Sequence, residues 1–211
     1  MNTFDEIRSF NDDEINAALT RLCDEKQFIN IVSTVYPLMP KDVIKQKLKS
    51  YTSSYQFQKG MVFPFLKNVE ANLSKGIELH GLELIERSTP YLYISNHRDI
   101  VLDPALLCLK LIENEMDTVE VAVGDNLLLL SWIKDIVRVN RSFLVKRGVS
   151  ARQIFESSRL LSAYIQNVIS EKRRSIWLAQ REGRSKNADD RTQESLLKML
   201  NMNGQTPNVA E

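Results

Sequence analysis

The pattern of apolar and polar positions changes once along the chain, near residue 76. Before that point apolar residues recur at helical spacing, and an acidic stretch at residues 11–14 has the character of a helix opening. Further helices are expected from about Asp24 and over residues 41–51, separated by the Pro-containing segment 36–40. The sequence therefore predicts a helical N-terminal region over residues 1–75.

After that point short apolar runs alternate with longer amphipathic stretches. Strands are expected at residues 77–81, 91–94, 118–123, 143–145 and 175–179, and helices at residues 126–137 and 151–171. The last helix has a clear start, because Ser150 and Gln153 form a capping-box pattern. This alternation predicts an α/β domain over residues 76–211, with a mixed or mostly parallel sheet and flanking helices.

One segment of the helical region has two interpretations. Residues 55–66 are rich in aromatic side chains and lie beside basic residues. One interpretation places this segment at a lipid interface, and the alternative packs it as a helix on the main domain. The basic side chains expected near anionic lipid in the first interpretation are Lys41, Lys45, Lys47, Lys49 and Lys59.

Composition excludes several classes of protein. The 211 residues are 43% hydrophobic and 26% charged, which is typical of a globular protein with a full-sized core. A net charge of +1 argues against a general nucleic-acid binder, and Cys23 and Cys108 lie in apolar helical contexts typical of buried thiols in a reducing compartment. We expect no metal site, no secretory signal and no membrane span, and hence a cytoplasmic protein that is at most peripheral to a membrane.

The candidate chemistry is concentrated directly after the expected strand at residues 91–94. Asn96, His97, Arg98 and Asp99 follow this strand, and Asp103 with Pro104 then opens an apolar run. We expect Asp103 to be the N-cap of a helix and Pro104 to be its first residue. In open α/β sheets, ligands and reacting groups gather at such a junction of strand, polar loop and helix.

Two further loops repeat this arrangement of a short strand followed by cations and a glycine. Lys146 and Arg147 follow residues 143–145, and a longer polar loop follows residues 176–178. That longer loop contains Arg181, Glu182, Gly183, Arg184 and Lys186. If the strands are parallel, all three loops meet at one edge of the sheet, where the arginines are suited to bind a phosphate.

These three loops carry a resemblance to a known family. Residues 96–103 resemble the first motif of the glycerolipid acyltransferases, which acylate glycerol-3-phosphate and lysophosphatidic acid. Residues 143–147 resemble the second motif, an apolar strand that ends at an arginine, and residues 181–185 resemble the third, a Glu-Gly pair followed by an arginine. The resemblance covers roughly residues 77–190 and leaves the N-terminal region outside it.

The resemblance implies an O-acyltransferase of phospholipid biosynthesis, similar to those that use 1-acylglycerol-3-phosphate. Its partners would be a lysophospholipid or glycerol-phosphate acceptor and an acyl-CoA or acyl-carrier-protein thioester as co-substrate, with no other cofactor, and a membrane surface is a further candidate partner. His97 would be the general base that removes a proton from the acceptor hydroxyl. The residues implied in substrate or phosphate binding are Arg98, Arg147, Arg181, Glu182, Gly183 and Arg184.

The chain also departs from the family pattern. Five residues separate His97 from Asp103, one more than in the family motif, and Leu102 stands where the family has its Asp. We favour Asp103 as the partner of His97, with Asp99 as the alternative. The fourth family motif is not found, so we expect a chain that lacks the C-terminal part of the domain.

Each candidate residue also has a purely structural interpretation. His97 would then be a loop histidine bonded to a carbonyl, Asp103 only a helix cap, and the arginines solvated surface charges. Residues 127–130 and Trp132 are expected in the core, or in a groove for an acyl chain. The competing functions are acyl transfer to a different lipid acceptor and a non-catalytic domain that binds an anionic lipid.

Overall fold

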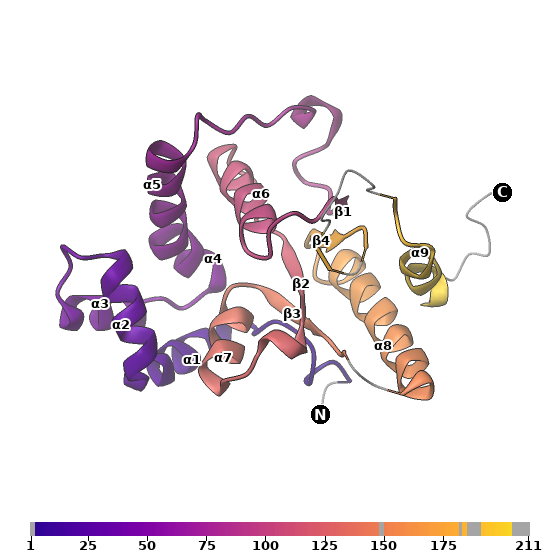
Figure 1. The fold of residues 1–211 in the computed structure, drawn as a ribbon, viewed down its shortest axis with the longest axis horizontal. Helices are drawn as coiled ribbons and strands as arrows, with labels where there is room; N and C mark the ends of the chain where they lie inside the picture. The colour runs from indigo at the N-terminus through magenta and orange to yellow at the C-terminus, as the bar shows by residue number, and fades with distance from the viewer. Residues whose placement is uncertain (1–2, 148–149, 182, 185–190, 204–211) are drawn as a thin grey trace.

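The N-terminal third of the chain is helical. The structure is a computed structural model that describes residues 3–147, 150–181, 183–184 and 191–203 (Figure 1). Its first helices are α1 (Asp12–Asp24), α2 (Lys26–Val35) and α3 (Lys41–Lys49), followed by one continuous helical run of α4 (Ser54–Phe57), a π-helical turn (Gln58–Val62) and α5 (Phe63–Leu73). The acidic opening behaves as expected, because the Glu14 carboxylate accepts a hydrogen bond from the Asn11 backbone N–H at 2.8 Å.

The second part of the chain alternates strands and helices. Its elements are a short 3₁₀ helix (Leu82–Leu84), β1 (Leu92–Ser95), α6 (Leu102–Glu113), β2 (Glu120–Gly124), a 3₁₀ turn (Asp125–Leu127), α7 (Ser131–Val139), β3 (Ser142–Val145), α8 (Ala151–Ser170), β4 (Ile176–Ala179), α9 (Glu194–Leu200) and a final 3₁₀ turn (Asn201–Asn203). The α/β fold expected from the alternation is confirmed.

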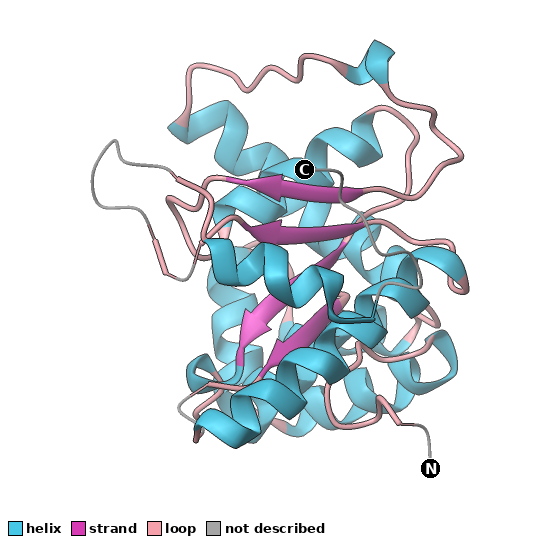
Figure 2. Ribbon diagram, turned by 90° about the vertical axis from the view of Figure 1, so that its right-hand side faces the viewer, coloured by secondary structure: helices cyan, strands magenta, loops and turns pink. Residues whose placement is uncertain are grey.

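The four strands form one parallel sheet in the order β1-β4-β2-β3. Tyr93 lies beside Trp177, and Val123 lies beside Leu144. Because every described strand runs the same way, as the arrowheads in Figure 2 show, the carboxyl ends of all four lie at one edge. This is the edge at which the sequence places its polar loops.

Helices cover both faces of the sheet (Figure 2). Successive side chains along a strand point to opposite faces, so neighbouring residues of one strand contact different helices. On β4, Ile176 and Leu178 pack in a cluster with Tyr164 and Ile165 of α8, whereas Trp177 packs in a separate cluster with Leu111 of α6. These side chains are less than a tenth exposed. The sheet is therefore a buried layer whose carboxyl edge carries the site.

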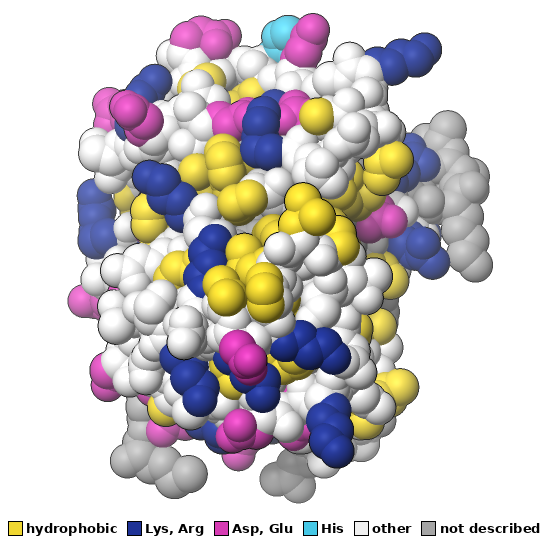
Figure 3. Space-filling view, turned by 90° about the vertical axis from the view of Figure 1, so that its left-hand side faces the viewer, with side chains coloured by type: hydrophobic (Ala, Val, Ile, Leu, Met, Phe, Trp, Pro, Cys, Tyr) yellow, Lys and Arg dark blue, Asp and Glu magenta, His cyan; other side chains and the backbone are white. Residues whose placement is uncertain are grey.

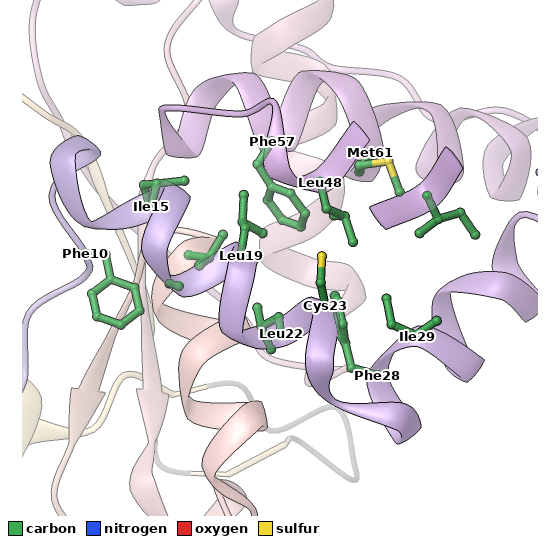
Figure 4. Close-up of a cluster of buried hydrophobic side chains, with 13 residues drawn as sticks. Phe10, Ile15, Leu19, Leu22, Cys23, Phe28, Ile29, Leu48, Phe57 and Met61 are labelled. Carbon is green, nitrogen blue, oxygen red and sulfur yellow. The ribbon is translucent and has the colours of Figure 1, made fainter. Parts of the chain in front are cut away.

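The helical region has its own apolar cluster, drawn in Figure 4, and this cluster reaches into the α/β part. It contains Ile15, Leu19 and Leu48, and also Val139 at the end of α7. Arg138 of α7 donates a hydrogen bond to the Arg8 carbonyl at 2.8 Å. The two parts of the chain thus share a core through α7, and the expected boundary near residue 76 stays a prediction.

The aromatic-rich segment at residues 55–66 packs as a helix against the rest of the protein. Phe57, Met61 and Leu66 are buried, and the Tyr36 hydroxyl donates a hydrogen bond to the Met61 carbonyl. Burial of these side chains removes them from any lipid contact. The packing interpretation therefore holds for these three side chains, whereas Phe65 of the same segment is 37% exposed.

Some expected elements were wrong or were missed. The strand at residues 77–81 is not formed, and Gly81, with a φ of 84°, leads instead into the 3₁₀ helix. The helix expected from residue 126 begins at Ser131, so that Leu129 and Leu130 are exposed and not in the core. Helix α9 was not expected.

Candidate active site

The imidazole of His97 is held by a carboxylate just beyond the end of β1. His97 Nδ1 lies 3.0 Å from Asp103 Oδ2, and both side chains are largely buried, at 14% and 22% exposed. The same oxygen accepts hydrogen bonds from the backbone N–H groups of Arg98 at 2.7 Å and Asp99 at 3.1 Å. Three donors thus fix the Asp103 carboxylate, which in turn fixes the ring.

The other candidate carboxylate, Asp99, has a different task. Its Oδ1 accepts hydrogen bonds from the backbone N–H groups of Val101 at 2.9 Å and Leu102 at 2.8 Å, at the start of α6. These bonds from Leu102 and Val101 lower the pKa of the Asp99 carboxyl. Asp99 therefore holds the turn that leads into α6, whose N-cap is Val101. The expectation that Asp103 is the N-cap and Pro104 the first helical residue was wrong, because α6 begins at Leu102.

An aromatic ring supports His97 from the neighbouring strand. The Trp177 indole meets the imidazole edge to face, with centroids 5.7 Å apart and planes at 65°. Trp177 is buried, and its Nε1–H donates to Ser95 Oγ at 2.9 Å. Nothing in the sequence marks Trp177 as a site residue, because an apolar residue inside a short strand indicates only core.

A second contact ties the ends of β1 and β4 together. Gln180 Nε2 donates to Asn96 Oδ1 at 2.7 Å, and the Gln180 backbone N–H donates to the Ser95 carbonyl at 2.9 Å. The Gln180 carbonyl in turn accepts a hydrogen bond from the Gln193 backbone N–H at 2.9 Å, just before α9. The base of the loop that carries His97 is thus bonded to Gln180 at the end of β4, and Gln180 is bonded in turn to the segment before α9.

His97 lines a cavity of about 940 Å³ that runs along the carboxyl edge of the sheet. The lining reaches from His97 after β1 to Arg147 after β3. Because β1 and β3 are the outer strands of the described sheet, the cavity crosses three strand spacings, roughly 14 Å at about 4.8 Å each. Such a volume is large enough for a lipid-sized ligand.

The cavity brings together most of the predicted binding residues. Arg147, Arg181, Gly183 and Arg184 line the same space as His97, whereas Arg98 does not. Glu182 and Lys186 lie outside the described residues. Gly124 leaves room for its neighbours, because a Cβ at this position would lie 2.5 Å from the Asn126 side-chain oxygen in its own loop and 3.5 Å from Cγ of Arg147 in the loop after β3.

Another part of the cavity wall is mostly apolar and comes from parts of the chain outside the three strand-end loops. Helices α8 and α9 supply Leu160, Leu161, Leu196 and Met199. The N-terminal segment supplies Ile7, whose backbone carbonyl accepts a hydrogen bond from the Leu144 N–H at 2.8 Å. No periodicity or motif marks Ile7 in the sequence, because its place depends on long-range packing.

The described residues contain no group of three or more His, Cys, Asp and Glu side chains arranged to hold a metal ion. Cys108 is packed in the cluster beneath α6, and burial raises the pKa of its thiol to about 11. The thiol is therefore protonated near neutral pH and is a poor nucleophile. A histidine held by a carboxylate beside a cluster of cations is an arrangement suited to general-base catalysis.

Comparison with known proteins gives a family. A family model described as acyltransferase matches residues 76–201, which are more than half of the chain. The comparison with curated proteins found no match to the chain. None of the described helices is long and apolar enough to cross a bilayer. The matched region contains His97, Asp103 and all three strand-end loops. The chain therefore belongs to the acyltransferase family of the glycerolipid acyltransferase superfamily, whose general chemistry is acyl transfer.

Proposed function

We propose that the protein transfers a fatty acyl group from a thioester to a hydroxyl of a glycerol-phosphate lipid such as lysophosphatidic acid, in phospholipid biosynthesis. One observation carries the proposal. The His97–Asp103 pair opens on a large cavity whose wall also contains Arg147, Arg181 and Arg184. A base and a set of cations around one cavity are what an acceptor with a hydroxyl and a phosphate requires.

His97 is the general base of the proposed reaction. The Asp103 carboxylate accepts a hydrogen bond from Nδ1–H, so that Nε2 carries the lone pair, and no described residue bonds to Nε2. Nε2 takes the proton of the acceptor hydroxyl while the oxygen of that hydroxyl attacks the carbonyl carbon of the thioester. The Asp103 carboxylate stabilises the imidazolium that results.

The reaction is completed by loss of the thiol. The new C–O bond has formed, the C–S bond breaks, and the leaving sulfur takes the proton from Nε2 of His97. Both histidine and aspartate return to their starting states without a covalent acyl-enzyme. The thioester, either acyl-CoA or an acyl carrier protein, is a co-substrate, and no other cofactor takes part in the proposed steps.

The arginines are assigned to the phosphate of the acceptor. Arg147 and Arg184 stand on different loops, so they can approach a phosphate from two sides. The apolar wall formed by Leu160, Leu161 and Met199 suits acyl chains, because it removes their methylene groups from water. The cytoplasmic face of a membrane is the proposed location, since lysophospholipid acceptors reside in membranes.

The experiment is a measurement of free thiol released from acyl-CoA by the purified chain, with lysophosphatidic acid or monoacylglycerol as acceptor. We expect release to depend on the acceptor and to be faster with lysophosphatidic acid. Arg184→Ala should raise KM for that acceptor about tenfold or more, since a hydrogen bond to a charged group contributes about 1.5–3 kcal/mol. The matched control is Arg159→Ala, an exposed arginine of α8 that does not line the cavity.

Two results would contradict the proposal. Equal rates with the phosphorylated and the unphosphorylated acceptor would assign the site to a different lipid. Binding of lysophosphatidic acid without any release of thiol would indicate a non-catalytic lipid-binding domain.

A further inference from the structure

The residue that precedes His97 is held on both its backbone and its side chain. Asn96 follows β1 directly, and its backbone carbonyl accepts a hydrogen bond from Ser95 Oγ at 2.9 Å. Its side-chain oxygen accepts a second hydrogen bond, from Gln180 Nε2 at 2.7 Å. Because a planar peptide unit joins Asn96 to His97, these two contacts restrict the place from which the imidazole projects.

Gln180 lies between the two segments that meet beside this histidine. Its backbone N–H donates to the Ser95 carbonyl and its carbonyl accepts from the Gln193 N–H, both at 2.9 Å. Its side-chain oxygen accepts a longer hydrogen bond from Thr192 Oγ1, at 3.5 Å. The amide group of Gln180 therefore has a partner at each end, one in the loop after β1 and one in the segment before α9.

The fold alone does not require a glutamine at this position. Gln180 follows the last residue of β4, after an apolar strand, and it is 9% exposed. Its backbone hydrogen bonds would form with any side chain except that of proline. A buried amide is costly unless its polar atoms are paired, and an apolar side chain of the same size would avoid that cost. The contribution of the amide is therefore its pair of contacts to the neighbouring segments.

We propose that Gln180 is a positioning residue that sets the orientation of the His97 imidazole through Asn96. Neither Gln180 nor Asn96 lines the cavity, whereas His97 does, so their effect on the reaction passes through the histidine. The proposal rests on the proposed function in one respect, the role of His97 as the general base. Displacement of a reacting group by about 1 Å can lower a rate by about 10²-fold, so a contact one residue away is sufficient to change turnover.

Three anchors then act on different parts of His97. Asp103 lies 3.0 Å from Nδ1 and determines which ring nitrogen carries the proton. Trp177 contacts the ring, with the two centroids 5.7 Å apart. Gln180 acts on the backbone that carries the ring. Loss of this third anchor should therefore move Nε2 and leave the tautomer unchanged.

Two substitutions remove the contact from opposite sides. Gln180→Met keeps a side chain of similar volume and loses both polar atoms. Asn96→Ala removes the acceptor at an exposed position, where a change of side chain rarely affects stability. Gln180→Glu is the conservative variant, because the Asn96 amide can rotate and donate its N–H to the carboxylate. The backbone hydrogen bonds of Gln180 remain in all three variants.

A second buried glutamine provides the matched control. Gln58 is 4% exposed and accepts a hydrogen bond from Thr118 Oγ1 at 2.6 Å, but it does not line the cavity. It belongs to the helical region, which lies on the side of the molecule that Figure 3 shows. Gln58→Met should therefore reproduce the loss of a buried amide without any effect on His97.

Proton NMR of the histidine rings, in a chain labelled isotopically only at histidine, tests the proposal without any turnover. The chain contains two histidines, His80 and His97, so the spectrum holds few signals. The signals of His97 depend on its distance from the Trp177 indole, because the ring current of an indole shifts nearby protons. Both variants that break the contact should shift the His97 signals, whereas Gln58→Met should leave them in place. The His80 signals should be unchanged throughout.

Thiol release at saturating acceptor measures the effect of this positioning on the reaction. Gln180→Met should lower kcat by about tenfold to 10²-fold and leave KM for the acceptor within about twofold, since Gln180 does not line the cavity. Gln180→Glu should recover kcat to within about threefold of wild type. Gln58→Met should retain wild-type kcat, and far-UV circular dichroism checks that each variant is folded.

The outcomes separate this proposal from the proposed function. The proposal is overturned if the His97 signals of Gln180→Met and Asn96→Ala stay at their wild-type positions, or if Gln58→Met lowers kcat as much as Gln180→Met does. It is also overturned if Gln180→Met shifts these signals yet keeps wild-type kcat in a chain that releases thiol. A wild-type chain that releases no thiol would contradict the proposed function instead, and a shift of the His97 signals would still support the positioning of the ring by Gln180.

Discussion

At the scale of single residues, the two carboxylates near His97 differ in the hydrogen bonds that they accept. The Asp103 carboxylate accepts hydrogen bonds from His97 and from the backbone of its loop, whereas the Asp99 carboxylate accepts them from the backbone N–H groups that lead into α6. The sequence left this choice open, because both residues lie within six positions of His97. The different hydrogen bonds of Asp99 and Asp103 arise from the path of the loop between β1 and α6, and the spacing of residues in the sequence does not determine that path.

Substitution of the two carboxylates by amides should separate their roles. Asp103→Asn should lower kcat by about 10²-fold or more, since an amide neither fixes the tautomer of His97 nor stabilises the imidazolium. Asp99→Asn should keep activity within about threefold of wild type, because the Asn side-chain oxygen can accept the same backbone N–H groups of Val101 and Leu102. The measurement is kcat for thiol release at saturating acceptor. A larger loss in Asp99→Asn than in Asp103→Asn would reverse the assignment.

Trp177 is expected to act as a positioning residue for His97. Trp177→Leu should lower kcat by about tenfold and leave KM for the acceptor nearly unchanged, because the edge-to-face contact contributes about 0.5–1.5 kcal/mol. Trp177→Phe should restore most of kcat by keeping an aromatic edge against the imidazole. Phe143→Leu, in the buried cluster under α8, is the control for a general loss of packing. Equal kcat in the Leu and Phe variants of Trp177 would assign it to packing alone.

At the scale of elements, an ion cluster joins α5 to α6. Lys110 Nζ lies 2.6 Å from Glu70 and 2.8 Å from Glu113, and Lys67 Nζ lies 2.9 Å and 2.6 Å from the same two carboxylates. Hydrogen bonds from Lys110 and Lys67 lower the pKa of Glu70 from 4.5 to about 2. Because this pKa is depressed in the folded state, ionised Glu70 stabilises the fold above its unfolded pKa.

The cluster gives a pH-dependent prediction. Glu70→Gln should lower the free energy of unfolding near neutral pH by a small amount, since Lys67, one of the two cations that it binds, is 45% exposed. The difference from wild type should shrink as the pH falls from 4.5 towards about 2, where the wild-type carboxylate takes up its proton. Urea unfolding at several pH values measures this difference. A difference that stays constant between pH 4.5 and about 2 would show that the ion pairs do not stabilise the fold.

Elements with a strong local signal were predicted, and those that depend on the rest of the protein were not. Strand β4 and helix α8 were expected within a few residues, because an apolar run and a capping box mark them. The segment at residues 77–81 has a strand-like pattern but lies outside the sheet, so it has no partner for its backbone. Helix α9 is too short to give a helical pattern in the sequence, and it depends on packing against α8.

At the scale of the whole molecule, the helical region and the α/β part depend on one another. Val139 of α7 lies in the same buried cluster as Leu19 of α1, and Ile7 packs with Phe143 and Leu144 of β3. The family match begins at residue 76, so it omits both contacts. A sequence motif identifies the chemistry here, but it does not delimit the unit that folds.

Removal of the N-terminal region should therefore unfold the remainder. The full chain should show a single cooperative thermal transition, because its clusters share residues across the expected boundary. Residues 76–211 alone should lack a cooperative transition, since α7 and β3 would lose the cover that residues 3–73 provide. Circular dichroism against temperature tests both chains. Two separate transitions in the full chain would indicate independent domains.

The most direct test of the account is acceptor-dependent thiol release by His97→Ala compared with His80→Ala. His80 is an exposed histidine, 85% accessible, that contacts Glu78 and lies outside the cavity lining. We predict that His97→Ala lowers kcat by about 10²–10⁴-fold, the usual contribution of a general base, while His80→Ala retains wild-type turnover. Turnover by His97→Ala within a few-fold of wild type, in a protein that releases thiol only with acceptor present, would contradict the assignment of His97 as the base.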